Sequence, residues 1–228
     1  MSNGILAVWS DIDAVMEDEY TAWYEREHMY DRLVVPGFHR ARHYVTVYGA
    51  PKYFTYYVTD DAAVMASAAY LASANHPTPW TQRILPHFRN TNRTACNVVR
   101  RLGRGYGAVV LTVRLAAVAG RETALLTWIG ETQLPALIQQ PGILAVQIWH
   151  ADREATWLPV TDRSLRPEPD QVADLVVFIE ATTRAPLTRV ASEALSPASL
   201  TTHGATTQSL VAIHQFLNGA ERLEPAAM

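Results

Sequence analysis

The strongest constraint on the fold of this 228-residue chain is an internal repeat. Pro36-Gly37 and Pro141-Gly142 lie 105 residues apart, and each pair follows a helix-like segment and precedes an extended one. A tryptophan stands 13 residues before each pair, at Trp23 and at Trp128. Because self-similarity at a fixed period indicates a duplicated structural unit, the chain is predicted to contain two copies of one fold.

The hydrophobic periodicity and the Gly/Pro punctuation predict the same order of elements in both copies. The first copy is predicted to contain strand 5–12, helix 14–34, strands 38–48 and 52–59, helix 61–73, a short helical piece near 79–88, and strand 93–101. The second is predicted to contain strand 107–117, helix 120–139, strands 143–151 and 173–182, helix 187–195, and strand 207–217.

The order βαββαβ is that of the split βαβ unit, an antiparallel four-stranded sheet with both helices on one face. The predicted fold class is therefore α+β, with tandem ferredoxin-like repeats that form an intramolecular barrel. The domains are residues 1–104, expected to be the active half, and residues 105–228, expected to be degenerate, with a loop insertion at 152–172. Function is expected in the cavity between the sheets, or between a sheet and its helices.

Composition excludes several classes of protein. The formal net charge is -3 without a run of like charges, so a nucleic-acid partner is not expected. Cys96 is the only cysteine, which excludes an internal disulfide framework, a Cys-rich zinc site and an iron-sulfur cluster, and it is interpreted as a buried strand residue. No apolar stretch is long enough for a membrane span, and the N-terminal residues lack a signal-peptide pattern, so we expect a cytoplasmic protein without a membrane partner.

One face of the first predicted helix mixes large aromatic side chains with titratable ones. At helical spacing that face carries Tyr20, Trp23, Tyr24, Glu27, His28 and Asp31. In the second copy Thr132 and Gln133 stand at the positions of Glu27 and His28, so the acid and the imidazole occur only once. The alternative is a solvated Glu-His pair. The inverted zinc motif His-x-x-Glu-His is incomplete here, so no metal is expected.

The strand after the first Pro-Gly pair has no plainly apolar face. His39 and His43 alternate with Arg40, Arg42 and Tyr44. A face that lines the barrel would present imidazole or guanidinium groups to a carboxylate, phenolate or enolate. The alternative is an edge strand with solvated arginines.

The loop from Asn75 to Trp80 holds a third group of candidates. His76 suits acid-base chemistry near neutral pH, and Tyr70 or Tyr57 could donate a hydrogen bond to a carbonyl oxygen. The alternative is a helix terminus that His76 caps. His87, His150, His203 and His214 are interpreted as structural or surface residues.

Three further segments have simpler interpretations. The glycines of residues 101–107 precede a strand rather than a helix, so this segment is interpreted as a flexible linker and not as a dinucleotide loop. Residues 152–172 are either a solvent-exposed elaboration or a lid over the cavity mouth. Residues from Asn218 onward are expected to be a frayed tail.

These residues resemble the dimeric α/β-barrel superfamily in its fused two-repeat form. Glu27-His28, followed by Arg32-Leu33 and Pro36-Gly37-Phe38, is similar to the helix-to-strand signature of the EthD-like branch. Tyr70 with His76-Pro77 resembles a segment of plant-type polyketide cyclases, although Pro79 replaces the second histidine of the His-Pro-x-His pattern. The superfamily includes cofactor-free cyclases and oxygenases, lactone isomerases and haem enzymes, so the fold alone does not select a reaction.

The leading hypothesis is a cofactor-independent acid-base enzyme, an isomerase, cyclase or lyase, for a small aromatic or hydrophobic carbonyl compound. His28, oriented by Glu27, would be the general base, with His76 as the alternative. Tyr57 or Tyr70 with Arg40 would stabilise an enolate oxygen. The remaining substrate-binding candidates are Trp9, Trp23, Tyr24, His43 and Trp80.

Three alternatives stay open. They are a non-catalytic protein that binds a hydrophobic metabolite, a haem enzyme with one histidine as axial ligand, and a cofactor-free oxygenase that uses the same base. The sequence also leaves open whether the fused chain forms a homodimer.

Overall fold

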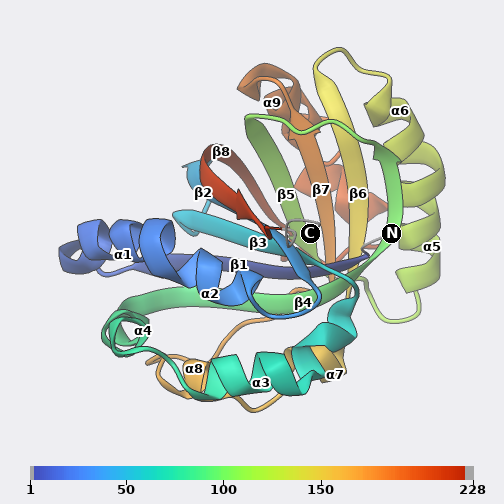
Figure 1. Cartoon of the computed structure of the whole chain (residues 1–228). Coiled ribbons are helices and arrows are strands. Elements are labelled where there is room, and N and C mark those ends of the chain that lie inside the picture. The colour runs from blue at the N-terminus through green and yellow to red at the C-terminus, as the bar shows by residue number, and fades with distance from the viewer. Residues whose placement is uncertain (1–2, 224–228) are drawn as a thin grey trace, which may run out of the picture.

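The computed structural model describes residues 3–223, in which eight strands close into one barrel (Figure 1). Around the barrel the strand order is β1-β3-β2-β8-β5-β7-β6-β4, and every neighbouring pair is antiparallel. The strands are β1 (Gly4–Ile12), β2 (Phe38–Tyr48), β3 (Tyr53–Thr59), β4 (Phe88–Gly103), β5 (Val109–Leu115), β6 (Ile143–Ala151), β7 (Leu175–Ala181) and β8 (Leu210–Glu221).

Each repeat contributes one four-stranded sheet with the same internal order, β4-β1-β3-β2 in the first and β8-β5-β7-β6 in the second. The edge strands of one sheet pair with those of the other, through β2–β8 and β4–β6. Closure removes the free edges that an isolated four-stranded sheet would expose. The predicted α+β class and the fused tandem barrel are confirmed.

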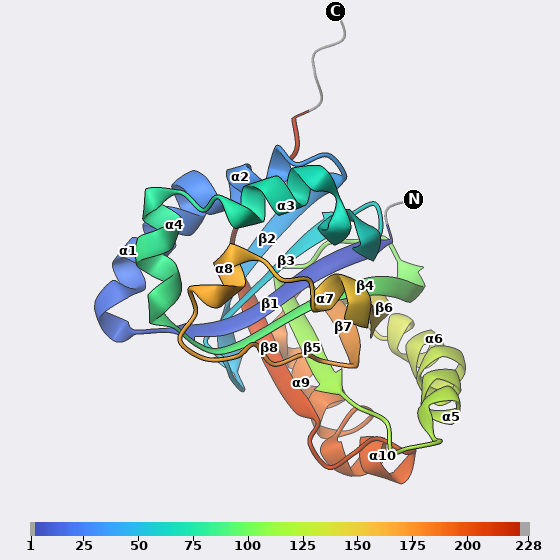
Figure 2. The same cartoon turned by 90° about the horizontal axis from the view of Figure 1, so that it is seen from below.

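The helices lie outside the barrel and cover the two sheets separately (Figures 1 and 2). In the first repeat, α1 (Glu17–Trp23), a π-helical turn (Tyr24–His28) and α2 (Met29–Leu33) form one helical segment, which α3 (Ala68–Asn75) and α4 (Pro79–Ile84) accompany. In the second repeat the corresponding elements are α5 (Glu122–Thr127), a π-helical turn (Trp128–Gln133), α6 (Leu134–Ile138), α9 (Arg184–Ser192) and α10 (Pro197–Thr202). No helix of the described residues is long and apolar enough to cross a membrane.

The barrel interior is filled with aromatic side chains. Trp149 stacks on Phe178 with ring centres 4.6 Å apart, and Trp9 stacks on Phe54 at 4.9 Å. Cys96 is buried in the same cluster, as the sequence predicted. Close packing of this kind fills the middle of the barrel. Open space remains at one end of the barrel, in a pocket of about 800 Å³ that Arg40, Gln147 and Glu180 help to line, and in a small pocket between the first sheet and its helices.

The predicted elements are all present, but several boundaries move. Strand β8 continues to Glu221, and Ala220 pairs with Ala41 of β2, so the prediction of a frayed tail from Asn218 is wrong as far as the strand extends. The rest of that tail, residues 224–228, lies outside the described residues. The predicted helix 61–73 divides into a 3₁₀ turn and α3, because Ser67 is extended and its hydroxyl caps α3 at the backbone N–H of Tyr70.

The insertion at 152–172 packs on the first repeat, although it belongs to the second. Its helices α7 (Arg153–Thr156) and α8 (Thr161–Ser164) lie beside β4 and α3 (Figure 2). The Thr156 hydroxyl accepts a hydrogen bond from the backbone N–H of Ala95, and Thr156 is completely buried. Part of the insertion is thus buried against the first repeat, whereas Arg153 and Trp157 are exposed to solvent.

Candidate functional site

A narrow pocket lies between the first repeat's sheet and its helices. It is lined by Leu6, Val8, Trp23, Tyr24, His28, Arg32, Tyr57, Tyr70, Leu85, Phe88, Arg93, Asp162 and Arg166. The lining combines aromatic walls with one imidazole and several buried charges. The cavity measures only about 40 Å³, room for a few water molecules, so a larger occupant would have to displace part of the wall.

His28 ends the π-helical turn at the centre of this pocket. Its ring stacks on Trp23 with centres 4.0 Å apart, and the Trp23 indole N–H donates to the Thr81 hydroxyl at 3.1 Å. Tyr24 meets the His28 ring edge-on at 5.4 Å. Single π-helical turns inside α-helices occur frequently at functional sites. Packing on both sides therefore fixes the imidazole without a hydrogen bond to a side chain.

The environment of His28 keeps its imidazole neutral. Burial lowers the pKa of His28 well below its usual range, and the nearby positive charges of Arg32 and Arg166 lower it further. No hydrogen-bond partner of its ring nitrogens occurs among the described residues 3–223. A neutral imidazole with a free lone pair can accept a proton near pH 7.

The structure places Glu27 differently from the sequence expectation. Its carboxylate accepts a hydrogen bond from the Thr78 hydroxyl at 2.5 Å, which ties the first helical segment to the loop before α4. No hydrogen bond joins it to the His28 ring in the described part of the chain. Stacking on Trp23, rather than Glu27, orients His28.

Two tyrosine hydroxyls and a second histidine lie at or next to the pocket. The Tyr57 hydroxyl is buried without a hydrogen-bond partner in the described residues, and burial raises its pKa well above the usual value, so it stays protonated. The Tyr70 hydroxyl accepts from Arg93 Nη2 at 2.6 Å. His43 lies behind Tyr24, stacked at 4.2 Å, and burial lowers its pKa to about 3.

The buried charges come from three different segments. Arg32 of α2 donates to the Ser73 hydroxyl at 2.6 Å and pairs with the Asp162 carboxylate of the insertion. Arg93 comes from β4, and Arg166 from the insertion. The insertion therefore supplies part of the wall of the first repeat's pocket.

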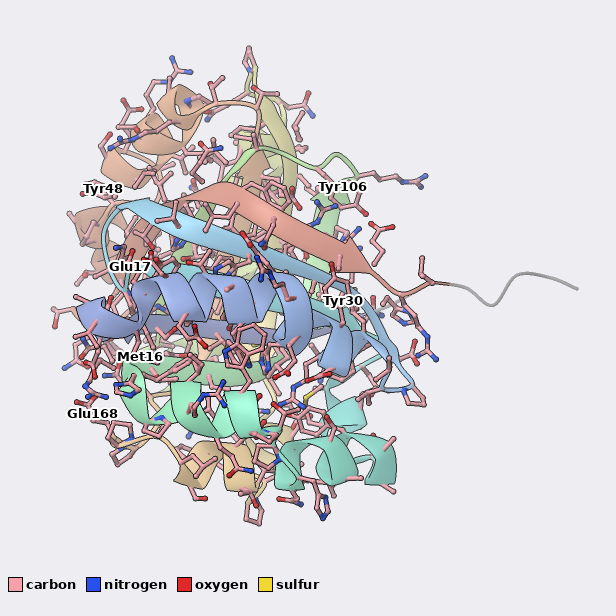
Figure 3. All side chains as sticks on the ribbon, turned by 60° about the vertical axis from the view of Figure 1, so that its left-hand side comes forward. Met16, Glu17, Tyr30, Tyr48, Tyr106 and Glu168 are labelled. Carbon is pink, nitrogen blue, oxygen red and sulfur yellow. The ribbon has the colours of Figure 1, made fainter. Side chains whose placement is uncertain are left out.

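Figure 3 shows the first helical segment along its length. Glu17 and Tyr30 mark opposite ends of the first helical segment, and Glu168 of the insertion lies at the same end as Met16 (Figure 3). Glu168 is held there by the backbone N–H of Asn90, which donates to its carboxylate at 3.1 Å. The insertion is thus anchored to β4 beyond the pocket as well as inside it.

Besides Glu27 and His43, four predicted site residues do not line this pocket. Trp9 lies in the barrel interior, where its indole N–H donates to the Thr112 hydroxyl at 3.2 Å. Arg40 lies at one end of the barrel, 4.2 Å above the Tyr106 ring. Trp80, in α4, is partly buried against the core of the first repeat. His76 closes the C-terminal end of α3, with Nδ1 2.8 Å from the Ala72 carbonyl oxygen.

His76 does line a second, outer pocket of about 210 Å³ that shares His28 and Arg32 with the inner one. Asp31, which is half-buried, also lines it, and burial raises the pKa of its carboxyl group. One edge of His28 thus meets the inner pocket while another meets the outer one.

The comparisons with known proteins identify the fold. No protein-family model and no curated protein matches the chain. Among solved structures, an anthrone oxidase-like protein aligns over 100% of this chain and 97% of its own, with a TM-score of 0.67 and 11% identity. A monooxygenase-like protein from Fusobacterium nucleatum aligns over 97% of this chain and 95% of its own, with a TM-score of 0.61 and 12% identity. A chlorite dismutase-like protein aligns over 96% of both chains, with a TM-score of 0.55 and 8% identity.

The chain is a fused dimeric α/β barrel. At these identities the likeness shows the fold and not the reaction. The second repeat of this fused barrel has the same scaffold as the first but different residues under its helices. Trp128 stacks on His203 at 3.8 Å, as Trp23 stacks on His28, yet the core under the second pair of helices is mainly aliphatic.

The inner pocket of the fused barrel does not fit a haem. His28 stacks face to face on Trp23 at 4.0 Å, and the cavity beside it measures about 40 Å³, far too little for a porphyrin ring. Two guanidinium groups, from Arg32 and Arg166, also lie near the imidazole that would bind iron.

Sequence reasoning missed the four charged residues of the pocket, Arg32, Arg93, Asp162 and Arg166. Arg32 follows His28 by four residues, and this helical spacing places both on one face, which is a usable signal. Arg93 alternates on β4 with buried positions of the barrel interior. Asp162 and Arg166 gave no signal, because the insertion reaches the pocket from the other repeat.

Proposed function

We propose that this protein is a cofactor-independent enzyme that removes a C–H proton next to the carbonyl group of a small aromatic compound. The observation that carries the proposal is the neutral His28, stacked on Trp23, facing an aromatic pocket that also contains arginines. A neutral base beside fixed positive charge favours a reaction that creates an anion.

The first step is proton transfer to a ring nitrogen of His28. The electron pair of the C–H bond forms the enolate double bond, and the negative charge moves to the carbonyl oxygen. The Tyr57 hydroxyl, buried and without a partner in the described residues, would donate its hydrogen bond to that oxygen. Trp23, Tyr24 and Phe88 would hold the aromatic ring of the substrate.

The second step decides the class of enzyme. In an isomerase, cyclase or lyase, the protonated His28 returns its proton to another atom of the substrate or of a leaving group. This leaves His28 neutral for the next cycle, so no oxidant or reductant is consumed. The outer pocket that contains Asp31 would let His28 exchange its proton with solvent.

A cofactor-free oxygenase is the second candidate, because the names of similar structures favour it. The same carbanion would react with O₂ to form a peroxide anion, which takes up a proton. For a CH₂ group the peroxide then loses water to give a new C=O, so that one O₂ supplies both the new carbonyl oxygen and the oxygen of the water. No further reductant is required.

Proton exchange in D₂O tests the first step without knowledge of the natural substrate. 1-Indanone and 2-tetralone, which both carry C–H groups next to the carbonyl, are incubated with the protein, and loss of the C–H signal is followed by NMR, with an oxygen electrode in parallel. We expect exchange above the buffer rate, and a fall of roughly 100-fold or more in His28→Gln. Oxygen uptake that also depends on His28 would select the oxygenase.

His203→Gln is the matched control, since His203 stacks on Trp128 in the second repeat but lines no part of this pocket. It should exchange at the parental rate. Equal exchange by the parent and by a folded His28→Gln would refute the role of His28. Binding of these ketones without exchange would instead support a metabolite-binding protein.

A further inference from the structure

The charges around the inner pocket do not balance. Four arginines, Arg32, Arg93, Arg163 and Arg166, lie largely buried at or directly behind its wall. The same region contains two buried carboxylates, Asp162 and Asp170. Two positive charges therefore have no buried carboxylate to neutralise them.

The ion pairs show where the excess lies. Asp170 binds Arg166 through two hydrogen bonds of 2.7 Å and Arg163 through one of 2.8 Å, and Asp162 pairs with Arg32. Arg93 donates to the Tyr70 hydroxyl at 2.6 Å and has no carboxylate partner among the described residues. Arg93 is 6% exposed and lines the pocket directly.

The acidic residues outside the pocket do not compensate this excess. Asp31 lines the outer pocket only, and Glu27 is bound to the Thr78 hydroxyl. Both carboxylates are partly exposed, so water weakens their interaction with a buried guanidinium. The excess positive charge therefore faces the inner pocket in the resting protein.

A buried cation without a counter-charge is unfavourable, because its hydration is lost and no ion pair replaces it. An enolate would supply a negative charge, but only transiently during turnover. Positive charge that is present before proton transfer fits a ligand that is already an anion when it binds. A planar carboxylate matches the guanidinium fork and the narrow space between aromatic walls.

We propose that the compound bound in this pocket is an aromatic carboxylate whose carboxyl group pairs with Arg93, next to Arg166. This proposal rests on the proposed function, in that it names the chemical class of the substrate. Because the resting cavity of about 40 Å³ is too small for an aromatic ring, binding displaces part of the wall. The ring then lies along Trp23, Tyr57 and Phe88, and the carboxylate neutralises part of the buried positive charge.

Binding of matched acids and amides tests the proposal. Benzoate and 1-naphthoate are compared with benzamide and 1-naphthamide, at constant ionic strength, by isothermal titration calorimetry on the full chain. We expect each carboxylate to bind at least tenfold more tightly than its amide. Arg93→Met should weaken carboxylate binding about 10- to 100-fold, the range of a hydrogen-bonded charge pair, and should leave amide binding unchanged.

Arg153→Met is the matched control, because Arg153 lies in the same insertion but is 69% exposed and lines no part of this pocket. It should bind the carboxylates like the parent. If Arg93→Met does not fold, the acid-amide comparison on the parent protein still decides the proposal.

Equal binding of acids and amides, or no binding of either acid, would overturn the proposal. Tighter binding of phenyl phosphate than of benzoate would replace the carboxylate by a phosphate ester and also overturn it. If the protein exchanges protons of neutral ketones through His28 but binds acids no more tightly than amides, the proposed function stands and the carboxylate proposal fails. If it prefers carboxylates but catalyses no proton exchange, the carboxylate site stands and the proposed function fails.

Discussion

The ion pair between Arg32 and Asp162 joins the two repeats at the pocket, and its removal should destabilise the whole fold. Asp162→Asn keeps the size of the side chain but leaves Arg32 buried without a carboxylate. Both side chains are about nine-tenths buried, at 7% and 11% exposure. Breaking a buried pair by neutralising one partner costs about 3–5 kcal/mol.

This free energy corresponds to a measurable change in melting temperature. With about 2.1 cal/mol/K of unfolding entropy per residue, a chain of this length has an unfolding entropy of about 0.5 kcal/mol/K. Asp162→Asn should therefore lower the Tm by roughly 6–10 °C, as measured by differential scanning calorimetry at pH 7.

An exposed ion pair in the same region is the control. Arg153 and Asp174 are 69% and 40% exposed, so Asp174→Asn should cost less than about 1 kcal/mol. The double variant Arg32→Met, Asp162→Leu should recover more than half of the loss, since apolar replacement of a buried pair is often neutral. A fall of less than about 2 °C in Asp162→Asn would refute the reasoning.

The other predictions follow from single contacts. Tyr57→Phe should change the free energy of unfolding in urea by less than about 0.5 kcal/mol, because it removes a buried hydroxyl without a partner in the described residues. It should nevertheless slow proton exchange about 100-fold. A large loss of stability would contradict this prediction. Proton exchange should be independent of pH from about 6.5 upward, since the pKa of His28 lies well below 6.5, and a rate still rising through pH 7 would argue against it. Burial lowers the pKa of His43 and His214 to about 3, so below pH 6.5 the unfolded chain binds more protons than the folded one. The free energy of unfolding should therefore fall as the pH drops from about 6.5 toward 3. His214→Gln should reduce the slope of unfolding free energy against pH by about 1.4 kcal/mol per pH unit. Phe178→Ala, in the barrel interior, should cost about 3–5 kcal/mol in urea unfolding, and a much smaller loss would mean that the interior is not close-packed.

The repeat made most of the fold predictable. Pro36-Gly37 and Pro141-Gly142 fixed the register of the two copies, and strand β2 begins and ends where the sequence predicted. The misplaced boundaries have a physical origin in pairing between repeats. Strand β8 continues past the predicted end because β2 of the other repeat supplies hydrogen-bonding partners as far as Glu221, which no local pattern reveals.

The face assignments were harder to predict than the elements. In β1 both faces are apolar, because the barrel interior covers Trp9 and the helices cover Leu6. Alternation therefore could not show that Trp9 points away from the pocket. In β2 the same ambiguity left Arg40 and His43 as equal candidates, although only His43 faces the helices.

The aromatic and imidazole part of the pocket, and Arg32 at helical spacing from it, could be predicted from the sequence, whereas the charges of the insertion could not. Trp23, Tyr24 and His28 share one helical face, which periodicity detects. Asp162 lies 130 residues after Arg32, and only the folded insertion brings them together. A contact of this kind depends on tertiary structure.

The insertion between β6 and β7 has a consequence for how the two halves can be separated. Its counterpart in the first repeat, between Tyr48 and Tyr53, is a tight turn. In a pair of identical chains every connection occurs twice, so a longer loop would alter both pockets together. Covalent fusion abolishes that symmetry, and one half can then lend a wall to the other. A chain cut at residues 103–107 would thus yield a first half whose pocket is open on one side, and its pocket could be restored only by adding the second half back.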